Sequence, residues 1–315
     1  MITLAHLSDL HATDPSRAGI APLASKRFFG WLSWKLRRRK RYRRHVAEAL
    51  IADLETQAAD HVAVTGDLTN ISLPFEFEVG ASILRALGTP ERISLVPGNH
   101  DAYVATGYEG AWQLWTDYLQ SDAGEAAGDG PADPLYAEAF PAPLPTVRVR
   151  GDLALVGVCT AVATPPFMAS GRVGPAQLER LKGVLEDLRE RGLCRVVLVH
   201  HPVVDGHVSC RRRCSDAEAL REVLENAGAE LVLHGHNHRS EFHQLATRDG
   251  EIPVVGVRSG SYAGPNEEKT AQYHLYEIQP SGQAGARRFD VRVRVRQWSS
   301  DRGAFEDTGT PIALP

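Results

Sequence analysis

The residue types best suited to chemistry in this chain come together at Gly98-Asn99-His100-Asp101. They follow the apolar run 93–97, which is typical of a buried strand that delivers polar side chains at its carboxyl end. An amide oxygen, an imidazole and a carboxylate within three positions suit a site for a metal ion and a phosphate. Because the same residues are also common in turns, the motif needs support from the rest of the chain.

Four further apolar runs also end at polar residues of this kind. The runs cover residues 2–7, 61–64, 194–199 and 230–233, and the residues at their ends are Asp9 and His11, Asp67, His200, and His236 and His238. Alternate residues of a strand share a face, so Asp9 and His11 are expected to point the same way. Oxygen and imidazole ligands without thiolates suit Mn, Fe or Zn better than Ca or Mg. The pattern therefore predicts a metal site.

The segments between these runs predict how the strand ends meet. Helical spacing of apolar residues predicts helices over 42–58, 74–87, 175–190 and 215–227. Ser215 and Glu218 fit a capping box at the start of the last helix. Strands that alternate with helices favour an α/β fold with parallel strands, whose carboxyl ends lie at one edge of the sheet.

The sequence beyond residue 238 predicts antiparallel strands. Between 289 and 296, apolar residues alternate with charged ones, which predicts a half-buried strand whose arginines face solvent. The turn at 259–262 is expected to be an ordinary turn.

Composition limits the classes of function. The chain has 315 residues, is 43% hydrophobic and has a formal net charge of −4, which argues against general nucleic-acid binding. Cys210 and Cys214 are spaced as in a metal site or a disulfide, but reduced thiols are the simpler interpretation. No signal peptide or apolar run of membrane-spanning length is evident, so we expect a cytoplasmic protein.

We interpret residues 1–315 as a single domain with insertions at about 16–45 and about 103–145. In the second insertion, Trp112, Trp115 and Leu119 predict a helix over 109–120. Residues 121–134 predict a loop beside the site.

The first insertion places aromatic residues before a dense cationic block, within 26–45. Three interpretations compete: a surface helix with packed tryptophans, a helix on an anionic membrane surface, and an arm that binds nucleic acid. The segment follows the loop of Asp9 and His11, so it should lie near the mouth of the site. Membrane contact is the functional interpretation that we favour, with the protein peripheral at the membrane.

A second basic run, Arg211, Arg212 and Arg213, follows the His200 loop and precedes the predicted helix at 215–227. One of these arginines could hold a substrate phosphate. The alternative is a solvated loop.

Taken together and in order, five motifs between residues 9 and 238 resemble the calcineurin-like metallophosphoesterase superfamily. They are Asp9-x-His11, Gly66-Asp67, Gly98-Asn99-His100-Asp101, His200 and Gly235-His236-x-His238. The resemblance implies a four-layer αββα sandwich that holds two metal ions (Mn, Fe or Zn). It implies a first ion bound by Asp9, His11 and His238, a second bound by Asn99, His200 and His236, and Asp67 as the bridge; His201 is kept as a structural residue.

The resemblance also implies the reaction, in which a metal-bound hydroxide attacks a phosphodiester or phosphomonoester. His100 would protonate the leaving group or steady a phosphoryl oxygen, and Asp101 would orient His100. Two alternatives are a membrane-associated pyrophosphatase or phosphodiesterase acting on a lipid-linked substrate, and a non-catalytic scaffold. A scaffold would be expected to have lost some of the ligands.

Overall fold

The strands of the chain form two sheets in the computed structural model, which describes residues 1–125, 133, 135–140, 142–204, 208–248, 250–281 and 289–314. Sheet 1 has the order β12-β11-β10-β1-β2-β3, with β13 paired to β11, and consists of β1 (Ile2–Leu7), β2 (His61–Val64), β3 (Ile93–Leu95), β10 (Gln272–Pro280), β11 (Phe289–Ser299), β12 (Ala304–Asp307) and β13 (Ile312–Ala313). Sheet 2 has the order β4-β5-β6-β7-β9-β8 and consists of β4 (Thr146–Arg150), β5 (Leu153–Val158), β6 (Cys194–Val199), β7 (Leu231–His234), β8 (Glu241–Thr247) and β9 (Gly250–Gly256).

Each sheet contains a parallel block whose strands end level with one another. In sheet 1, β1, β2 and β3 are parallel, with Leu7 opposite Val64 and Val64 opposite Leu95. In sheet 2, β5, β6, β7 and β9 are parallel, with Val199 opposite His234. The predicted parallel strands are confirmed. The antiparallel prediction beyond residue 238 holds for β8, β10, β11, β12 and β13 but not for β9, which runs parallel to β7.

The two faces of each sheet pack against different layers of the fold. Leu4 of β1 and Leu198 of β6 belong to one buried cluster, which fills the space between the sheets. Their neighbours Ala5 and Val199 belong to two other clusters, which lie under helices. Because successive side chains of a strand point to opposite faces, each sheet is buried on both sides, as expected of largely apolar parallel strands.

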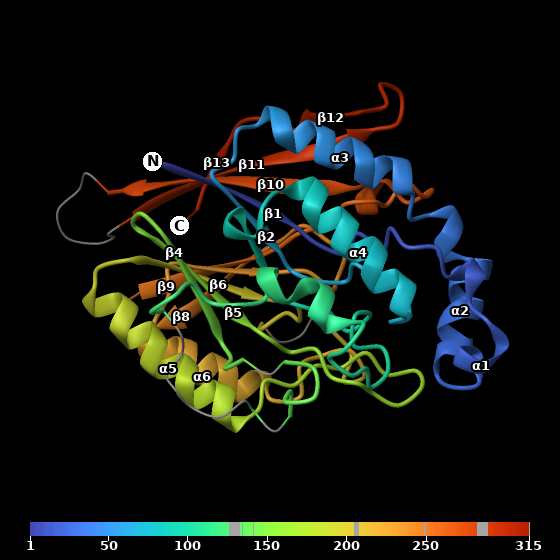
Figure 1. The fold of residues 1–315 in the computed structure, drawn as a ribbon. Coiled ribbons are helices and arrows are strands. Elements are labelled where there is room, and N and C mark those ends of the chain that lie inside the picture. The colour runs from blue at the N-terminus through green and yellow to red at the C-terminus, as the bar shows by residue number, and fades with distance from the viewer. Residues whose placement is uncertain are drawn as a thin grey trace.

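Four helices form the outer layers (Figure 1). α3 (Arg44–Thr56) and α4 (Pro74–Leu87) contribute apolar residues to the cluster on sheet 1, and α5 (Pro175–Glu190) and α6 (Ala217–Ala227) contribute to the cluster on sheet 2. The order helix, sheet, sheet, helix is the αββα sandwich that the family resemblance implies.

Shorter helical segments lie between these elements. They are η1 (Pro15–Arg17), α1 (Ile20–Leu23), α2 (Arg27–Leu36), η2 (Arg38–Lys40), η3 (Pro90–Arg92), η4 (Trp112–Tyr118) and η5 (Glu267–Lys269). α1 and α2 lie at one end of the molecule, away from the outer helices α5 and α6 (Figure 1). Among the described helices, none is both long and apolar enough to cross a membrane.

The helix predicted over 109–120 is shorter in the structure and is the 3-10 helix η4. Trp112 and Trp115 are buried against Phe77 of α4, with ring centroids 5.0 and 4.7 Å from it. Packing of two large rings on one helix determines this segment more than helical periodicity does. Most of the predicted loop 121–134 lies outside the described residues.

The predicted capping box at Ser215 and Glu218 is wrong. α6 has Asp216 at its N-cap position, without a side-chain cap bond. The Asp216 carboxylate instead accepts hydrogen bonds from the backbone N–H groups of Val173 (2.9 Å) and Gly174 (2.8 Å). The Asp216 side chain therefore makes a tertiary contact instead of the hydrogen bond that would cap α6.

The prediction of a solvated arginine row on β11 is also wrong in part. Arg292 is exposed, but α3 lies on this face of the sheet and Arg296 Nε donates to Asp53 Oδ2 of α3 at 3.0 Å. Arg294 lies 3.6 Å from Glu277 on β10. These arginines join the sheet to its covering helix.

Candidate metal centre

The polar residues predicted from the sequence come together where strands of both sheets end. Asp9 follows β1, Asp67 follows β2, Asn99 follows β3, His200 follows β6 and His236 follows β7. Backbone hydrogen bonds tie these loops together, from Asp9 N to Gly66 O (2.9 Å) and from His11 N to Asp67 O (3.0 Å). The five loops therefore form one cluster.

Five of the predicted ligands adopt left-handed backbone conformations. They are Asp9 (φ 53°), His11 (φ 43°), Asp67 (φ 58°), His236 (φ 67°) and His238 (φ 52°). A residue with a Cβ adopts this region at an energetic cost, although Asp and His do so more readily than most. Such residues cluster at functional sites, where the surrounding structure holds them in place.

Two glycines of the motifs are required by close approach. A Cβ on Gly98 would collide with Asp67 Oδ1, and a Cβ on Gly235 would collide with the hydroxyl of Ser8. Only glycine allows the loops to pack this closely.

Asp101 holds the loop of Asp67 in position. Its buried carboxylate accepts hydrogen bonds from the backbone N–H groups of Asp67 (2.8 Å), Thr69 (2.9 Å) and Gly98 (3.0 Å). Burial raises the pKa of Asp101 to about 6. The role predicted for Asp101, orienting the ring of His100, is wrong, because His100 Nδ1 bonds to the carbonyl oxygen of Asn70 at 2.6 Å.

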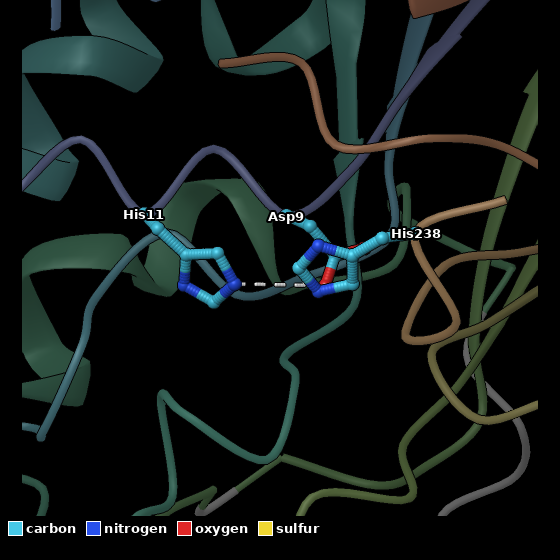
Figure 2. Close-up of side chains that lie close together, drawn as sticks. All are labelled: Asp9, His11 and His238. Carbon is cyan, nitrogen blue, oxygen red and sulfur yellow. Dashed lines mark ion pairs between the residues drawn. The ribbon is translucent and has the colours of Figure 1, made fainter. Parts of the chain in front are cut away.

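One group of donors surrounds Asp9 (Figure 2). His238 Nε2 lies 3.1 Å and His11 Nε2 lies 3.8 Å from Asp9 Oδ1. His11 Nε2 is also 3.7 Å from Asp67 Oδ2. One ligand atom from each of Asp9, His11 and His238 lies within 4.8 Å of the other two, which is close enough for all three to bind one metal ion.

A second group of donors also lies beside Asp67. His200 Nε2 is 3.5 Å from Asp67 Oδ2 and 3.2 Å from Asn99 Oδ1. His236 Nδ1 is 2.8 Å from the same Asn99 oxygen. Asp67 thus lies within reach of both groups, as a bridging carboxylate would.

Hydrogen bonds fix which ring nitrogen faces the site. His11 Nδ1 donates to Thr69 O at 3.0 Å and His200 Nδ1 donates to Thr65 O at 2.6 Å, because a carbonyl oxygen can only accept. In a neutral ring this leaves the lone pair on Nε2, toward the carboxylates. Burial lowers the pKa of both histidines, which favours the neutral form that binds metals.

The carboxylates need a partner of positive charge. Asp67 is buried, and burial together with the charges of Asp9 and Asp101 raises its pKa well above the ordinary value. Buried His236 Nε2 has no hydrogen-bond partner among the described residues. Two buried carboxylates with neutral imidazoles and this unpartnered nitrogen fit metal ions, which satisfy such groups.

Arg38 of η2 enters the mouth of the site, and sequence reasoning did not single it out. Its Nη2 donates to His11 Nε2 at 2.8 Å and its Nη1 to His100 Nε2 at 2.9 Å. Arg38 is one of ten lysines and arginines between residues 26 and 44, so its position in the sequence does not distinguish it.

Further residues missed from the sequence line the same mouth. Tyr42 Oη lies 3.0 Å from His238 Nδ1. Lys269 lines a cavity of about 300 Å³ together with Arg38, His100 and the predicted Arg212. For Tyr42 and Lys269, no motif marks the position.

The structure separates the arginines of the second basic run. Arg212 Nη2 donates to His236 O at 3.2 Å, at the rim of the site. All three arginines are exposed, and the backbone carbonyls of Arg211 and Arg213 accept hydrogen bonds from Ala169 and Gly171. Arg212 is therefore the member of the run that lies at the site.

Three other predictions can be compared with the structure. The ring nitrogens of His201 contact Thr160 Oγ1 (2.7 Å) and Ala169 O (3.2 Å), as expected of a structural histidine. The hydroxyl of Ser259 donates to Asp9 O at 2.6 Å, so the turn at 259–262 supports the first loop. All four cysteines are free thiols, Cys210 and Cys214 included.

Comparison with known proteins gives one family and several similar structures. Residues 2–240 match the family model described as calcineurin-like phosphoesterase. The chain is similar to a dimetal phosphatase from Danio rerio, with 11% identity, coverage of 99% of this chain and 98% of that chain, and a TM-score of 0.58. A search of curated proteins gives no match.

Two longer proteins share the fold. They are a purple acid phosphatase, PPD1, from yellow lupin (13% identity, 97% of this chain, 52% of that chain, TM-score 0.51) and a 5′-nucleotidase precursor from Thermus thermophilus (15% identity, 96% of this chain, 55% of that chain, TM-score 0.50). The chain spans about half the length of each.

The buried histidines predict how the stability of the metal-free chain depends on pH. Burial lowers the pKa of nine histidines: His6, His11, His61, His100, His200, His201, His234, His236 and His274. As the pH falls below about 6.5, the unfolded chain takes up protons that the folded chain does not, so the stability present above this pH is lost. The raised pKa values of Asp67, Asp101 and Glu76 act in the opposite sense but are fewer.

Urea unfolding of chelator-treated protein checks this expectation. The midpoint is expected to be clearly lower at about pH 5 than at about pH 7. An unchanged or higher midpoint at the lower pH would contradict the assignment of neutral, buried histidines.

Proposed function

The chain belongs to the calcineurin-like phosphoesterase family, and from this premise we propose that it hydrolyses a phosphodiester or phosphomonoester at a centre of two metal ions. The observation that carries the proposal is the position of Asp67, a buried carboxylate whose Oδ2 lies 3.7 Å from His11 Nε2 of the first group and 3.5 Å from His200 Nε2 of the second. The complete donor set argues against a non-catalytic scaffold, in which ligands would be free to change.

The residues that would hold the ions follow from the two groups. Asp9, His11 and His238 would bind the first ion. Asn99, His200 and His236 would bind the second, and Asp67 would bind both. Imidazole, carboxylate and amide donors suit Mn, Fe or Zn.

When bound, two such ions would clamp a phosphate ester and supply an activated water as the nucleophile. The side chains at the mouth bind and orient the ester. Arg38, Arg212 and Lys269 place positive charge around the cavity, which attracts an anionic substrate. The planar guanidinium of Arg38 can donate two parallel hydrogen bonds to phosphoryl oxygens.

We assign to His100 the transfer of a proton to the leaving group. Its Nδ1 donates to Asn70 O, which directs Nε2 into the mouth beside Arg38. Burial and then the charge of Arg38 lower the pKa of His100 in the free protein. An anionic ester beside the ring would raise the pKa of His100, because a nearby negative charge favours the imidazolium. The Nε2–H of the imidazolium can donate to the leaving oxygen.

A lipid-linked pyrophosphate or phosphodiester is a second candidate substrate. The observation that favours it is that the aromatic and basic segment 26–45 leads directly into the site through Arg38. In the order of the chain, α2 ends at Leu36 and η2 begins at Arg38.

Hydrolysis of model esters tests the proposed function. Metal-stripped protein refilled with Mn is expected to cleave bis(p-nitrophenyl) phosphate or p-nitrophenyl phosphate, and Asp67→Ala is expected to lose both cleavage and one or both ions. The ratio of the two rates indicates whether diesters or monoesters are preferred. Wild-type protein that binds two ions but cleaves neither ester would contradict a general phosphoesterase.

Replacement of His100 separates proton transfer from metal binding. His100→Ala is expected to lower kcat by roughly 10²–10⁴-fold while two ions remain bound, because the ring acts on the leaving group. His45→Ala, at an exposed position, serves as the control. His100 also lies with His11 and Asp67 in a group that could hold a metal, so loss of metal from His100→Ala would make it a ligand and overturn the assigned role.

Replacement of Arg38 tests its contact with the substrate. Arg38→Ala is expected to lower kcat/KM by roughly 10–100-fold with metal content unchanged, since a hydrogen bond to a charged group is lost. Arg38→Lys should restore part of the loss, because it keeps the charge but not the planar fork. Equal kcat/KM values for wild type, Arg38→Ala and the exposed control Arg302→Ala would show that Arg38 does not contact the substrate.

A further inference from the structure

α2 has two different faces, and one of them packs on the body of the protein. Arg27 Nε donates to Ile71 O at 2.9 Å and its Nη2 to Ser72 O at 2.6 Å. Trp34 is buried. Gly30 lies so close to the body that a Cβ would meet Ile71 and the hydroxyl of Tyr103. These contacts hold the helix in a defined orientation.

The other face of α2 is apolar and exposed. It carries four exposed apolar side chains, and Phe167 from a separate loop lies beside them. These five residues are called the α2 apolar face: Phe28, Phe29, Leu32, Leu36 and Phe167. Leu36 is 64% exposed and Phe167 is 72% exposed. The rings of Phe29 and Phe167 are 4.9 Å apart, so the two segments form one patch. Clustered large apolar side chains in solvent indicate a surface that binds something.

Positive charge is concentrated in the same segment of the chain. Residues 26–44 contain ten lysines and arginines, and no acidic residue occurs between Asp14 and Glu48, although the whole chain has a net charge of −4. The exposed cations are Lys35, Arg37, Arg39, Lys40, Arg41, Arg43 and Arg44. The concentration of cations in a chain that is acidic overall points to an anionic partner.

We propose that α2 and the basic residues after it dock the protein on an anionic membrane surface. A helix with aromatic and aliphatic side chains on one face and Lys or Arg beside it binds at the boundary between headgroups and acyl chains. Nucleic acid would use the cations but gives Leu32 and Leu36 no partner. An anionic bilayer offers headgroup charge to the cations and acyl chains to the apolar side chains.

The same segment reaches the candidate metal centre, which connects docking with the substrate. Arg38 follows α2 directly and contacts His11 and His100. Trp34, Arg39 and Lys40 line a cavity of about 870 Å³ that extends to His11. Docking would therefore bring the mouth near phosphate-bearing headgroups; this part of the inference rests on the proposed function.

Co-sedimentation with vesicles tests the docking surface. The full chain is mixed with vesicles of equal parts phosphatidylcholine and phosphatidylglycerol, or of phosphatidylcholine alone. Binding is expected on the anionic vesicles, weaker with added salt, and at least about tenfold weaker without phosphatidylglycerol.

Two pairs of variants separate the apolar and the charged contributions. Phe28→Ser with Leu36→Ser, and Arg37→Glu with Arg39→Glu, are each expected to weaken binding to anionic vesicles by at least about tenfold. The matched controls carry the same changes at exposed positions elsewhere, Phe242→Ser with Ile312→Ser and Arg292→Glu with Arg302→Glu. They should bind as the wild type does, and circular dichroism and thermal unfolding confirm that each variant folds.

The outcomes distinguish the docking surface from the proposed function. No vesicle binding, equal binding by folded variants and wild type, or a preference for a single-stranded oligonucleotide over anionic vesicles would overturn the proposal. Cleavage of bis(p-nitrophenyl) phosphate is measured on the same wild-type preparation. Cleavage without vesicle binding rejects docking alone, whereas vesicle binding without cleavage supports docking and counts against the esterase.

Discussion

The structure of the site depends on the burial of one carboxylate, Asp67, between two groups of donors. A buried carboxylate beside a second one, Asp9, is costly unless positive charge compensates it. The surrounding loops are built to keep it there, with backbone N–H groups held by Asp101 and left-handed conformations at five donors. Gly98 permits the close approach. Metal ions would relieve this electrostatic cost, so the arrangement makes physical sense as a two-metal centre.

Local sequence patterns predicted the parallel strands and the cluster of donors, whereas the four-layer sandwich followed from the family resemblance. Apolar runs predicted the strands, and the position of Asp9, Asp67 and His200 directly after them placed these residues at one edge. The sequence did not predict what tertiary packing decides. Arg38 reaches the site because Gly30 and the face around it fix α2 on the body. Contacts that involve whole elements also decided η4, the N-cap of α6 and the partner of His100.

The segment 26–45 contributes both to the candidate metal centre and to the exposed apolar surface of α2. One side of α2 is fixed by Arg27 and Trp34, and the following residues bring Arg38 and Tyr42 to the donors. The other side leaves apolar side chains in solvent. A single rigid segment can therefore influence both what reaches the site and where the protein is held. A segment of this kind can change which molecules reach a site without changing the donors.

Anomalous X-ray diffraction from crystals of the Mn-loaded protein tests the central claim most directly. The account predicts two anomalous peaks, one within bonding distance of Asp9, His11 and His238 and the other within bonding distance of Asn99, His200 and His236. Asp67 should contact both. A single peak, or two peaks of which only one contacts Asp67, would contradict the claim that this carboxylate organises a two-metal centre.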